Sequence, residues 1–199
     1  MSRVAVVFTG GTIAMRHDPV AGGAVPTLDG GAIVALTPGL DTIADVETID
    51  WGLVPASHLR FDQVLDIARL LERTLGRDDV DGAVVVQGTD TIEETAFCYD
   101  LLVRSTKPVV VVGAMRNAGE AGYEGPANLR DAVRCAAEPR LRDQGTLVVM
   151  AGTILPGDEA TKTDTAAYGT FRAPDFGPLR WPAKMAPARS HVTPPPGNA

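Results

Sequence analysis

Residues Val84–Thr95 read VVVQGTDTIEET, and this stretch decides the fold that the sequence predicts. Its apolar start, Val84–Gln87, lacks the alternation of a half-exposed strand, and strands buried on both faces belong to parallel sheets flanked by helices. A glycine turn, Gly88-Thr89-Asp90, follows at once, and a helix is expected to open after it. Because ligands of open α/β sheets lie beyond the carboxyl ends of the strands, Thr89 and Asp90 are placed where chemistry would occur.

The same polar residues also fit a plain helix cap. Asp90 or Thr91 could serve as the N-cap, and Glu93 and Glu94 would then complement the helix dipole from the first turn. Taken alone, the stretch favours neither the cap nor a functional site.

A second copy of the arrangement opens the chain and favours a site. Val4–Thr9 is predicted to be a buried strand, and Gly10-Gly11-Thr12 follows it, so another hydroxyl sits on a glycine turn at a strand end. The glycines allow positive φ and a close approach of the backbone to a small ligand. They match neither a dinucleotide fingerprint nor a P-loop, because no Lys-Ser/Thr pair follows them. Two such turns can face each other across a parallel sheet.

The remaining elements continue the alternation of strand and helix. They are a strand at Val46–Ile49, a helix at Arg60–Leu75 that stops at Gly76, a helix from Thr91 to about Val103, a strand at Val109–Val112, a helix from Pro126 to Ala137 and a strand at Thr146–Met150. The helix before Gly76 has an apolar stripe, expected to face the core, of Phe61, Val64, Leu65, Ala68, Leu71 and Leu75. This order predicts a doubly wound, Rossmann-like or flavodoxin-like α/β fold with a mostly parallel sheet flanked by helices.

Three stretches lack the periodicity of helix or strand. Met15–Gly31 is rich in Gly and Pro and predicts a long loop. Ala151–Phe171 is polar, and Lys162 within it would by default be a solvated surface group. Residues 181–199 are rich in proline and predict a flexible tail, so a single domain is expected over residues 1–180.

Composition excludes several classes of function. A chain of 199 residues, 45% hydrophobic, can bury one sizeable core, and a net charge of −7 without a basic block argues against nucleic-acid or anionic-membrane partners. No apolar stretch reaches the length of a membrane-spanning helix, so a cytoplasmic protein is expected. Cys98 and Cys135 are expected to be buried thiols, and His17, His58 and His191 are too scattered to suggest a metal site.

The polar residues together suggest nucleophilic catalysis by a hydroxyl. A threonine hydroxyl is a poor nucleophile at neutral pH, and a neutral lysine held by a neighbouring acid can serve as its base. The N–H groups of glycine turns could stabilise an oxyanion, which contributes about 3–4 kcal/mol per donor in hydrolases. This equipment needs no metal, nucleotide or other cofactor, and indicates a possible hydrolase.

Several motifs in order resemble the N-terminal domain of the bacterial-type L-asparaginase family. They are TGGTIA (Thr9–Ala14), VVQGTDTIEETA (Val85–Ala96), PVVVVGAMR (Pro108–Arg116), GPANLRDAV (Gly125–Val133), ATKTDT (Ala160–Thr165) and FGPL (Phe176–Leu179). The resemblance covers residues 4–179 and implies hydrolysis of L-asparagine, with L-glutamine as a weaker substrate.

The resemblance also implies catalytic roles. Thr12 would be the nucleophile that attacks the side-chain amide carbon. Thr89, Lys162 and Asp90 would form a second hydroxyl–lysine–acid group that activates a hydroxyl or the hydrolytic water.

Substrate-binding roles follow in the same way. Asp90 would also hold the α-ammonium group of the substrate, and Ser57 its α-carboxylate. Gly11, Gly88 and Ala114 would approach the substrate through their backbones.

The sequence departs from the family in two respects that bear on function. The family has a tyrosine in the loop after TGGTIA, whereas Met15–Gly31 contains none. The chain ends at Ala199, soon after FGPL, and so predicts a short form without the second family domain. Either this is a naturally short enzyme that completes its site in a homo-oligomer, a dimer or tetramer, or it is a truncated and weakened relative. The alternative is a non-catalytic amino-acid-binding module, or an amidotransferase-type subunit that needs a partner.

Overall fold

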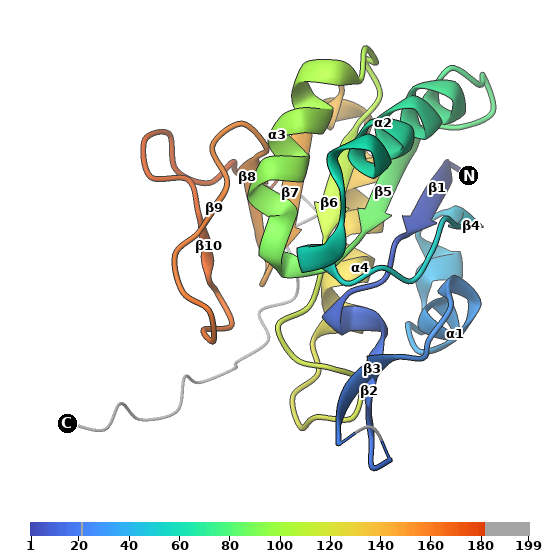
Figure 1. Ribbon diagram of the computed structural model, residues 1–199. Coiled ribbons are helices and arrows are strands. Elements are labelled where there is room, and N and C mark those ends of the chain that lie inside the picture. The colour runs from blue at the N-terminus through green and yellow to red at the C-terminus, as the bar shows by residue number, and fades with distance from the viewer. Residues whose placement is uncertain (21, 182–199) are drawn as a thin grey trace.

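The protein is described here by a computed structural model that covers residues 1–20 and 22–181 (Figure 1). Its strands are β1 (Arg3–Phe8), β2 (Met15–Asp18), β3 (Gly23–Pro26), β4 (Asp45–Asp50), β5 (Gly82–Val86), β6 (Val109–Val112), β7 (Thr146–Met150), β8 (Thr153–Pro156), β9 (Thr161–Lys162) and β10 (Phe171–Arg172). Its α-helices are α1 (Gly30–Ala35), α2 (Phe61–Leu75), α3 (Ile92–Leu102) and α4 (Gly125–Ala136). Short 3₁₀ helices are η1 (Thr12–Ala14), η2 (Leu40–Thr42), η3 (Ala56–His58), η4 (Thr89–Thr91) and η5 (Pro139–Leu141).

The central sheet has the strand order β4-β1-β5-β6-β7-β8. All neighbours are parallel except β7 and β8, which pair antiparallel at the edge. Numbered along the chain, the five parallel strands run 2-1-3-4-5, which is the flavodoxin-like order. The predicted doubly wound, mostly parallel fold is therefore confirmed, and its topological switch point lies between β1 and β5.

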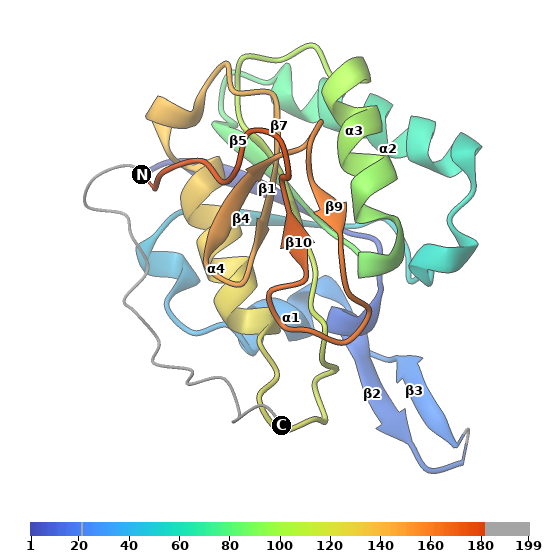
Figure 2. The ribbon, with the colours of Figure 1, turned by 90° about the vertical axis from the view of Figure 1, so that its left-hand side faces the viewer.

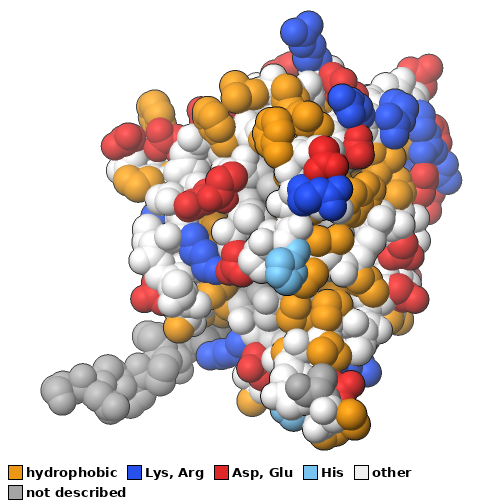
Figure 3. All heavy atoms as spheres, in the orientation of Figure 1, with side chains coloured by type: hydrophobic (Ala, Val, Ile, Leu, Met, Phe, Trp, Pro, Cys, Tyr) orange, Lys and Arg blue, Asp and Glu red, His pale blue; other side chains and the backbone are white. Residues whose placement is uncertain are grey.

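Helices cover both faces of this sheet (Figure 2). α2 and α3 lie together on one face, whereas α4 packs across β5, β6 and β7 on the other and α1 contacts β1 and β4. Strands β5 and β6 have no exposed residue, which explains their unbroken valine runs. Hydrophobic side chains also gather on the outer surface of α2 and α3 (Figure 3), and the exposed ones there include Phe61, Phe97 and Leu101.

Three local expectations were wrong. The supposed loop Met15–Gly31 contains the β2–β3 hairpin and the start of α1, because backbone pairing orders it without a periodic apolar pattern. Phe61 is 70% exposed at the first position of α2 and does not join the core stripe, which instead includes Ile67. The strand series continues past Met150, since the polar segment after it supplies the edge strand β8.

The amino end of the sheet carries an ion-pair network. Arg3 contacts Asp45 and Asp79, each at 2.8 Å, and Arg77 contacts Glu47 at 2.7 Å and Asp79 at 2.9 Å. Hydrogen bonds from Arg77 and Arg3 lower the pKa of Asp79 to about 2, and Arg77 also lowers the pKa of Glu47. The network links β1 and β4 to the segment that precedes β5, at the end of the sheet where β1 and β5 begin.

The predicted tail, apart from Trp181, lies outside the described residues, as does His191. Trp181 donates its Nε1–H to the carbonyl of Gly152 at 2.7 Å, so the domain contacts extend to the last described residue. No helix in the described part of the chain is long and apolar enough to cross a membrane.

Candidate active site

The glycine turns after β1 and β5 touch at the carboxyl edge of the sheet. Gly11 has φ +88°, and a Cβ added to it would lie 2.2 Å from the N and Cα atoms of Gly88. No residue with a side chain fits there, so this contact requires glycine on the β1 side. The two turns, 77 positions apart, thus face each other across neighbouring parallel strands, as their positions in the sequence predict.

A third turn joins them from β6. A Cβ added to Gly113 would lie 2.8 Å from the carbonyl oxygen of Gln87 and 3.0 Å from Cγ2 of Thr89. Asn128 of α4 fixes this turn, because its Nδ2 donates to the Gly113 carbonyl at 3.0 Å and its Oδ1 accepts from Ala151 N at 3.1 Å. Ala114, fully buried, therefore lies next to the Thr89 turn.

A fourth segment, η3, places Ser57 beside the β5 turn. A Cβ added to Gly88 would lie 2.7 Å from Cβ of Ala56, the residue before Ser57, and η3 packs against η4. Ser57 itself is exposed, which leaves its hydroxyl accessible to a ligand.

Lys162 reaches this edge from outside the central sheet. Its Nζ donates to Oγ1 of Thr89 at 2.9 Å and to Oδ1 of Asp90 at 3.0 Å. The lysine side chain is only 14% exposed, so the default of a solvated surface group is wrong. The structure thus brings together a hydroxyl, an ammonium and a carboxylate, which is the group that the resemblance implies.

The cap interpretation of the same residues finds little support. Thr91 occupies the N-cap position of α3 without a side-chain capping bond, and its buried Oγ1 has no hydrogen-bond partner within the described structure. Asp90 directs one oxygen to Lys162. Glu93, expected only to complement the helix dipole, accepts hydrogen bonds from Thr161 Oγ1 and Lys162 N at 2.7 and 2.6 Å.

Thr12 opens η1 directly after the Gly11 contact and is half-buried. Tyr123 supports this short helix, because its hydroxyl donates to the carbonyl of Ile13 at 2.7 Å. Burial raises the pKa of Tyr123 to about 12, so the hydroxyl stays protonated and can donate at neutral pH. Tyr123 was missed at the sequence level, since it lies 110 positions from its partner and no local pattern links them.

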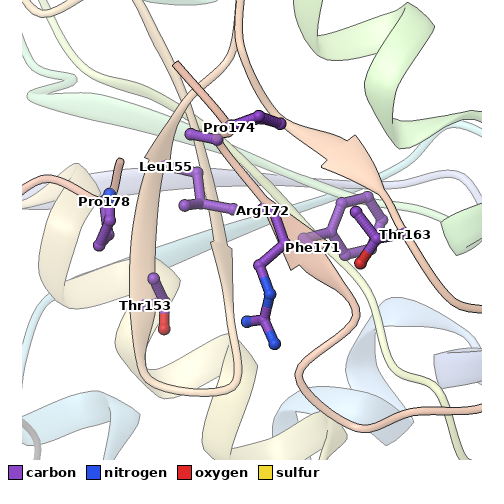
Figure 4. A pocket seen from close by; sticks show the side chains of 8 residues that line it. Thr153, Leu155, Thr163, Phe171, Arg172, Pro174 and Pro178 are labelled. Atoms are coloured by element: carbon purple, nitrogen blue, oxygen red, sulfur yellow. The ribbon is translucent and has the colours of Figure 1, made fainter. Parts of the chain in front are cut away.

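A hollow of the domain lies away from these residues. It measures about 390 Å³ and lies between β8 and the β9–β10 hairpin, with Leu155, Phe171 and Pro178 among its lining residues (Figure 4). None of the predicted site residues lines it, although Thr163 follows Lys162 in the chain. The candidate site therefore rests on the converging turns and the lysine contacts, and this hollow has no part in it.

Within the described residues no cluster of three or more His, Cys, Asp or Glu side chains could hold a metal ion. Cys98 and Cys135 are both free thiols. Burial raises the pKa of each, and Cys135 also lies near Asp131. These cysteines are therefore unsuited to act as thiolates at neutral pH.

Comparison with known proteins gives a consistent picture. The family model described as "Asparaginase, N-terminal" matches residues 3–191. L-asparaginase 2 of Escherichia coli (strain K12) is 34% identical over 97% of this chain and 57% of its own length. L-asparaginase 2 of Bacillus subtilis (strain 168) is 38% identical over 73% of this chain and 39% of its own length. The chain thus spans about half the length of the curated relatives it matches.

A solved structure shows the same fold. The probable cytoplasmic L-asparaginase from Campylobacter jejuni superimposes with a TM-score of 0.83 and 31% sequence identity. The match covers 93% of this chain and 55% of that protein.

Proposed function

The chain belongs to the asparaginase family, and on that premise we propose that it hydrolyses L-asparagine to L-aspartate and ammonia. The observation that carries the proposal is the contact of Lys162 Nζ with both Thr89 Oγ1 and Asp90 Oδ1 beside the meeting point of Gly11 and Gly88. A module that only binds an amino acid has no need of a lysine directed at a hydroxyl. L-glutamine, one methylene longer, is proposed as a weaker substrate.

In this proposal Thr12 is the nucleophile. Its hydroxyl oxygen attacks the side-chain amide carbon, and the hydroxyl proton leaves to a base. The amide nitrogen departs as ammonia after it takes up a proton, and an ester between Thr12 and the aspartyl group remains. Water then adds to this ester and releases L-aspartate and the free hydroxyl, so atoms and charge balance over the two steps.

The second threonine and the lysine are proposed to move the protons. In the first step Lys162, through Thr89, is proposed to take up the proton that Thr12 releases and to deliver it to the leaving nitrogen. In the second step the same pair is proposed to take a proton from the hydrolytic water and to pass it to the Thr12 oxygen as the ester breaks. Backbone N–H groups of the turns that contain Gly11, Gly88 and Ala114 are proposed to face the substrate amide, where they would stabilise the oxyanion.

Substrate binding uses the exposed parts of the same edge. The Asp90 carboxylate is 63% exposed although it contacts Lys162, so it can also accept the α-ammonium group of the substrate. Ser57, brought to this edge by Ala56, is proposed to bind the α-carboxylate. No cofactor enters the proposal.

The remaining proposals concern partners and location. We expect a homo-oligomer, dimer or tetramer, in the cytoplasm, in keeping with the compartment named for the Campylobacter jejuni protein. Oligomer formation would supply groups to a site whose substrate-binding edge is partly open to solvent.

The test is ammonia release from L-asparagine and L-glutamine by the purified protein, with oligomeric mass measured on the same sample. We expect Thr12→Ala to lower kcat about 1,000-fold or more. Thr89→Ala and Lys162→Ala should each lower it about 100-fold or more. Thr153→Ala, a threonine of the hollow beside β8, is the matched control and should retain activity.

A well-folded wild-type protein without activity would contradict the proposal. Binding of L-aspartate without turnover, or a stable complex with a second protein, would then favour the amino-acid-binding or amidotransferase-type alternative. Equal loss of activity in Thr153→Ala and Lys162→Ala would argue against the assigned site.

A further inference from the structure

The lysine of the candidate site sits on a short and isolated piece of sheet. Within the described structure β9 has two residues and pairs with β10 alone, outside the six-stranded sheet. The hairpin lies beside α3 (Figure 1). A two-residue strand in a two-stranded ribbon holds its side chains weakly, because such ribbons are marginally stable by themselves. The position of Lys162 therefore depends on what fixes β9 to the domain.

Glu93 supplies that connection. Its Oε2 accepts a hydrogen bond from the backbone N of Lys162 at 2.6 Å and another from Oγ1 of Thr161 at 2.7 Å. Both donors belong to β9, and the N–H of Lys162 faces α3 while the strand pairs with β10 on its other side. Hydrogen bonds to a carboxylate are shorter and stronger than neutral ones, so this pair is a firm attachment.

The location of Glu93 links this attachment to the chemistry. Glu93 lies in the first turn of α3, three positions after Asp90 and four after Thr89. The continuous segment from Thr89 to Glu93 thus holds Lys162 at two points. Glu93 accepts a hydrogen bond from its backbone N–H, and Thr89 and Asp90 accept hydrogen bonds from its Nζ. The lysine is fixed at both ends of its side chain relative to the same few residues.

We propose that Glu93 is a positioning residue, which sets the distance between the Lys162 ammonium and the Thr89 hydroxyl by fixing the backbone of β9. The inference rests on the proposed function for its effect on turnover, but its geometric content stands without it. Glu93 does not touch the proposed reacting atoms and acts through Lys162 alone.

The first test compares kinetics of Glu93→Ala, Glu93→Gln and Glu94→Gln. Misplacement of a catalytic group by about 1 Å costs about 100-fold in rate, so Glu93→Ala should lower kcat about 10–100-fold with KM within about 2-fold of wild type. Glu93→Gln keeps an acceptor oxygen for both donors of β9 and should therefore retain most of the wild-type rate. Glu94→Gln removes the same charge from the same helical turn at an exposed position and should leave kcat unchanged.

A double-mutant cycle then asks whether Glu93 acts through the lysine. In a Lys162→Ala background, Glu93→Ala should cause no further loss of kcat, because residues that act as a unit are non-additive. A full additional loss in that background, or a change in KM alone, would overturn the inference.

The second test does not require turnover. Lysines are labelled with acetic anhydride, and mass spectrometry measures the rate of modification at Lys162 against Lys107. Lys162 in the wild type should react slowly because its ammonium is enclosed, whereas Glu93→Ala should raise its rate several-fold and Glu94→Gln should not. Circular dichroism of each variant verifies folding, and Glu93→Leu, which removes the acceptor but keeps a side chain of similar size, serves if Glu93→Ala does not fold.

The two proposals fail in different ways. A folded wild type that releases no ammonia contradicts the function, yet the labelling result still decides the role of Glu93. Unchanged labelling of Lys162 in Glu93→Ala contradicts the positioning role, whatever the activity.

Discussion

The Nζ atom of Lys162 lies 2.9 Å from Oγ1 of Thr89, although 73 positions separate the two residues in the chain. Lys162 comes from a small outer hairpin, and Thr89 from the turn after the central strand β5. The candidate site is therefore assembled where the outer hairpin packs beside α3, and its geometry depends on the contacts that hold the turns and the hairpin together.

Gly11→Ala should destabilise the protein. The added Cβ would lie 2.2 Å from Gly88 atoms, and the backbone φ of +88° is strained for alanine, so we expect a loss of about 2–5 kcal/mol in the free energy of unfolding. Urea denaturation measures this loss. Gly23→Ala, with nothing within 4 Å of its Cβ, is the control and should change stability by less than about 1 kcal/mol.

Asn128→Ala should loosen the turns after β6 and β7 together. The side chain is 1% exposed and bridges the Gly113 carbonyl and the Ala151 N–H. Loss of its amide removes this partner from the buried Gly113 carbonyl and from the half-buried Ala151 N–H, which should cost about 1–3 kcal/mol of stability. Chemical denaturation gives the loss, and faster amide hydrogen exchange at Ala151 should accompany it. Unaltered exchange there would contradict the bridging role.

Tyr123→Phe isolates a single hydrogen bond next to Thr12. The variant loses the bond to the Ile13 carbonyl, so stability at pH 7 should fall by about 1 kcal/mol and kcat should fall as well. Burial raises the pKa of Tyr123 in the folded protein to about 12, above the ordinary tyrosine value of 10.0. Its contribution is complete below pH 10 and is lost as the pH rises toward 12. Denaturation curves between pH 8 and pH 12 should therefore converge for wild type and variant.

Asp79→Asn probes the ion pairs at the amino end of the sheet. Hydrogen bonds from Arg77 and Arg3 lower the pKa of Asp79 in the folded protein to about 2, below the ordinary aspartate value of 3.8. Its stabilising contribution is therefore present above pH 4 and is lost as the pH falls toward 2. The thermal midpoint of the wild type should drop more steeply than that of Asp79→Asn over this range. Parallel acid titrations of the two proteins would contradict the assignment. High salt should weaken the difference, because these pairs are exposed.

The local parts of the fold could be predicted because they depend on local patterns. The valine runs of β5 and β6 are buried strands, Gly76 follows α2, and Pro126 lies in the first turn of α4. The Met15–Gly31 hairpin escaped prediction because its pairing satisfies backbone groups while most of its side chains stay partly or fully exposed. Burial, which creates the apolar pattern, is weak there.

The sequence by itself determined the strand–turn–helix units and placed Thr12, Thr89 and Asp90 on turns at strand ends, since strand burial and glycine conformation are properties of a few neighbouring residues. Only the tertiary structure decided that the Gly11 and Gly88 turns touch and that Lys162 is held by Glu93 against Thr89. Such contacts join residues far apart in the chain. Their geometry follows from the strand order and the packing of the outer hairpin on α3, which no short segment encodes.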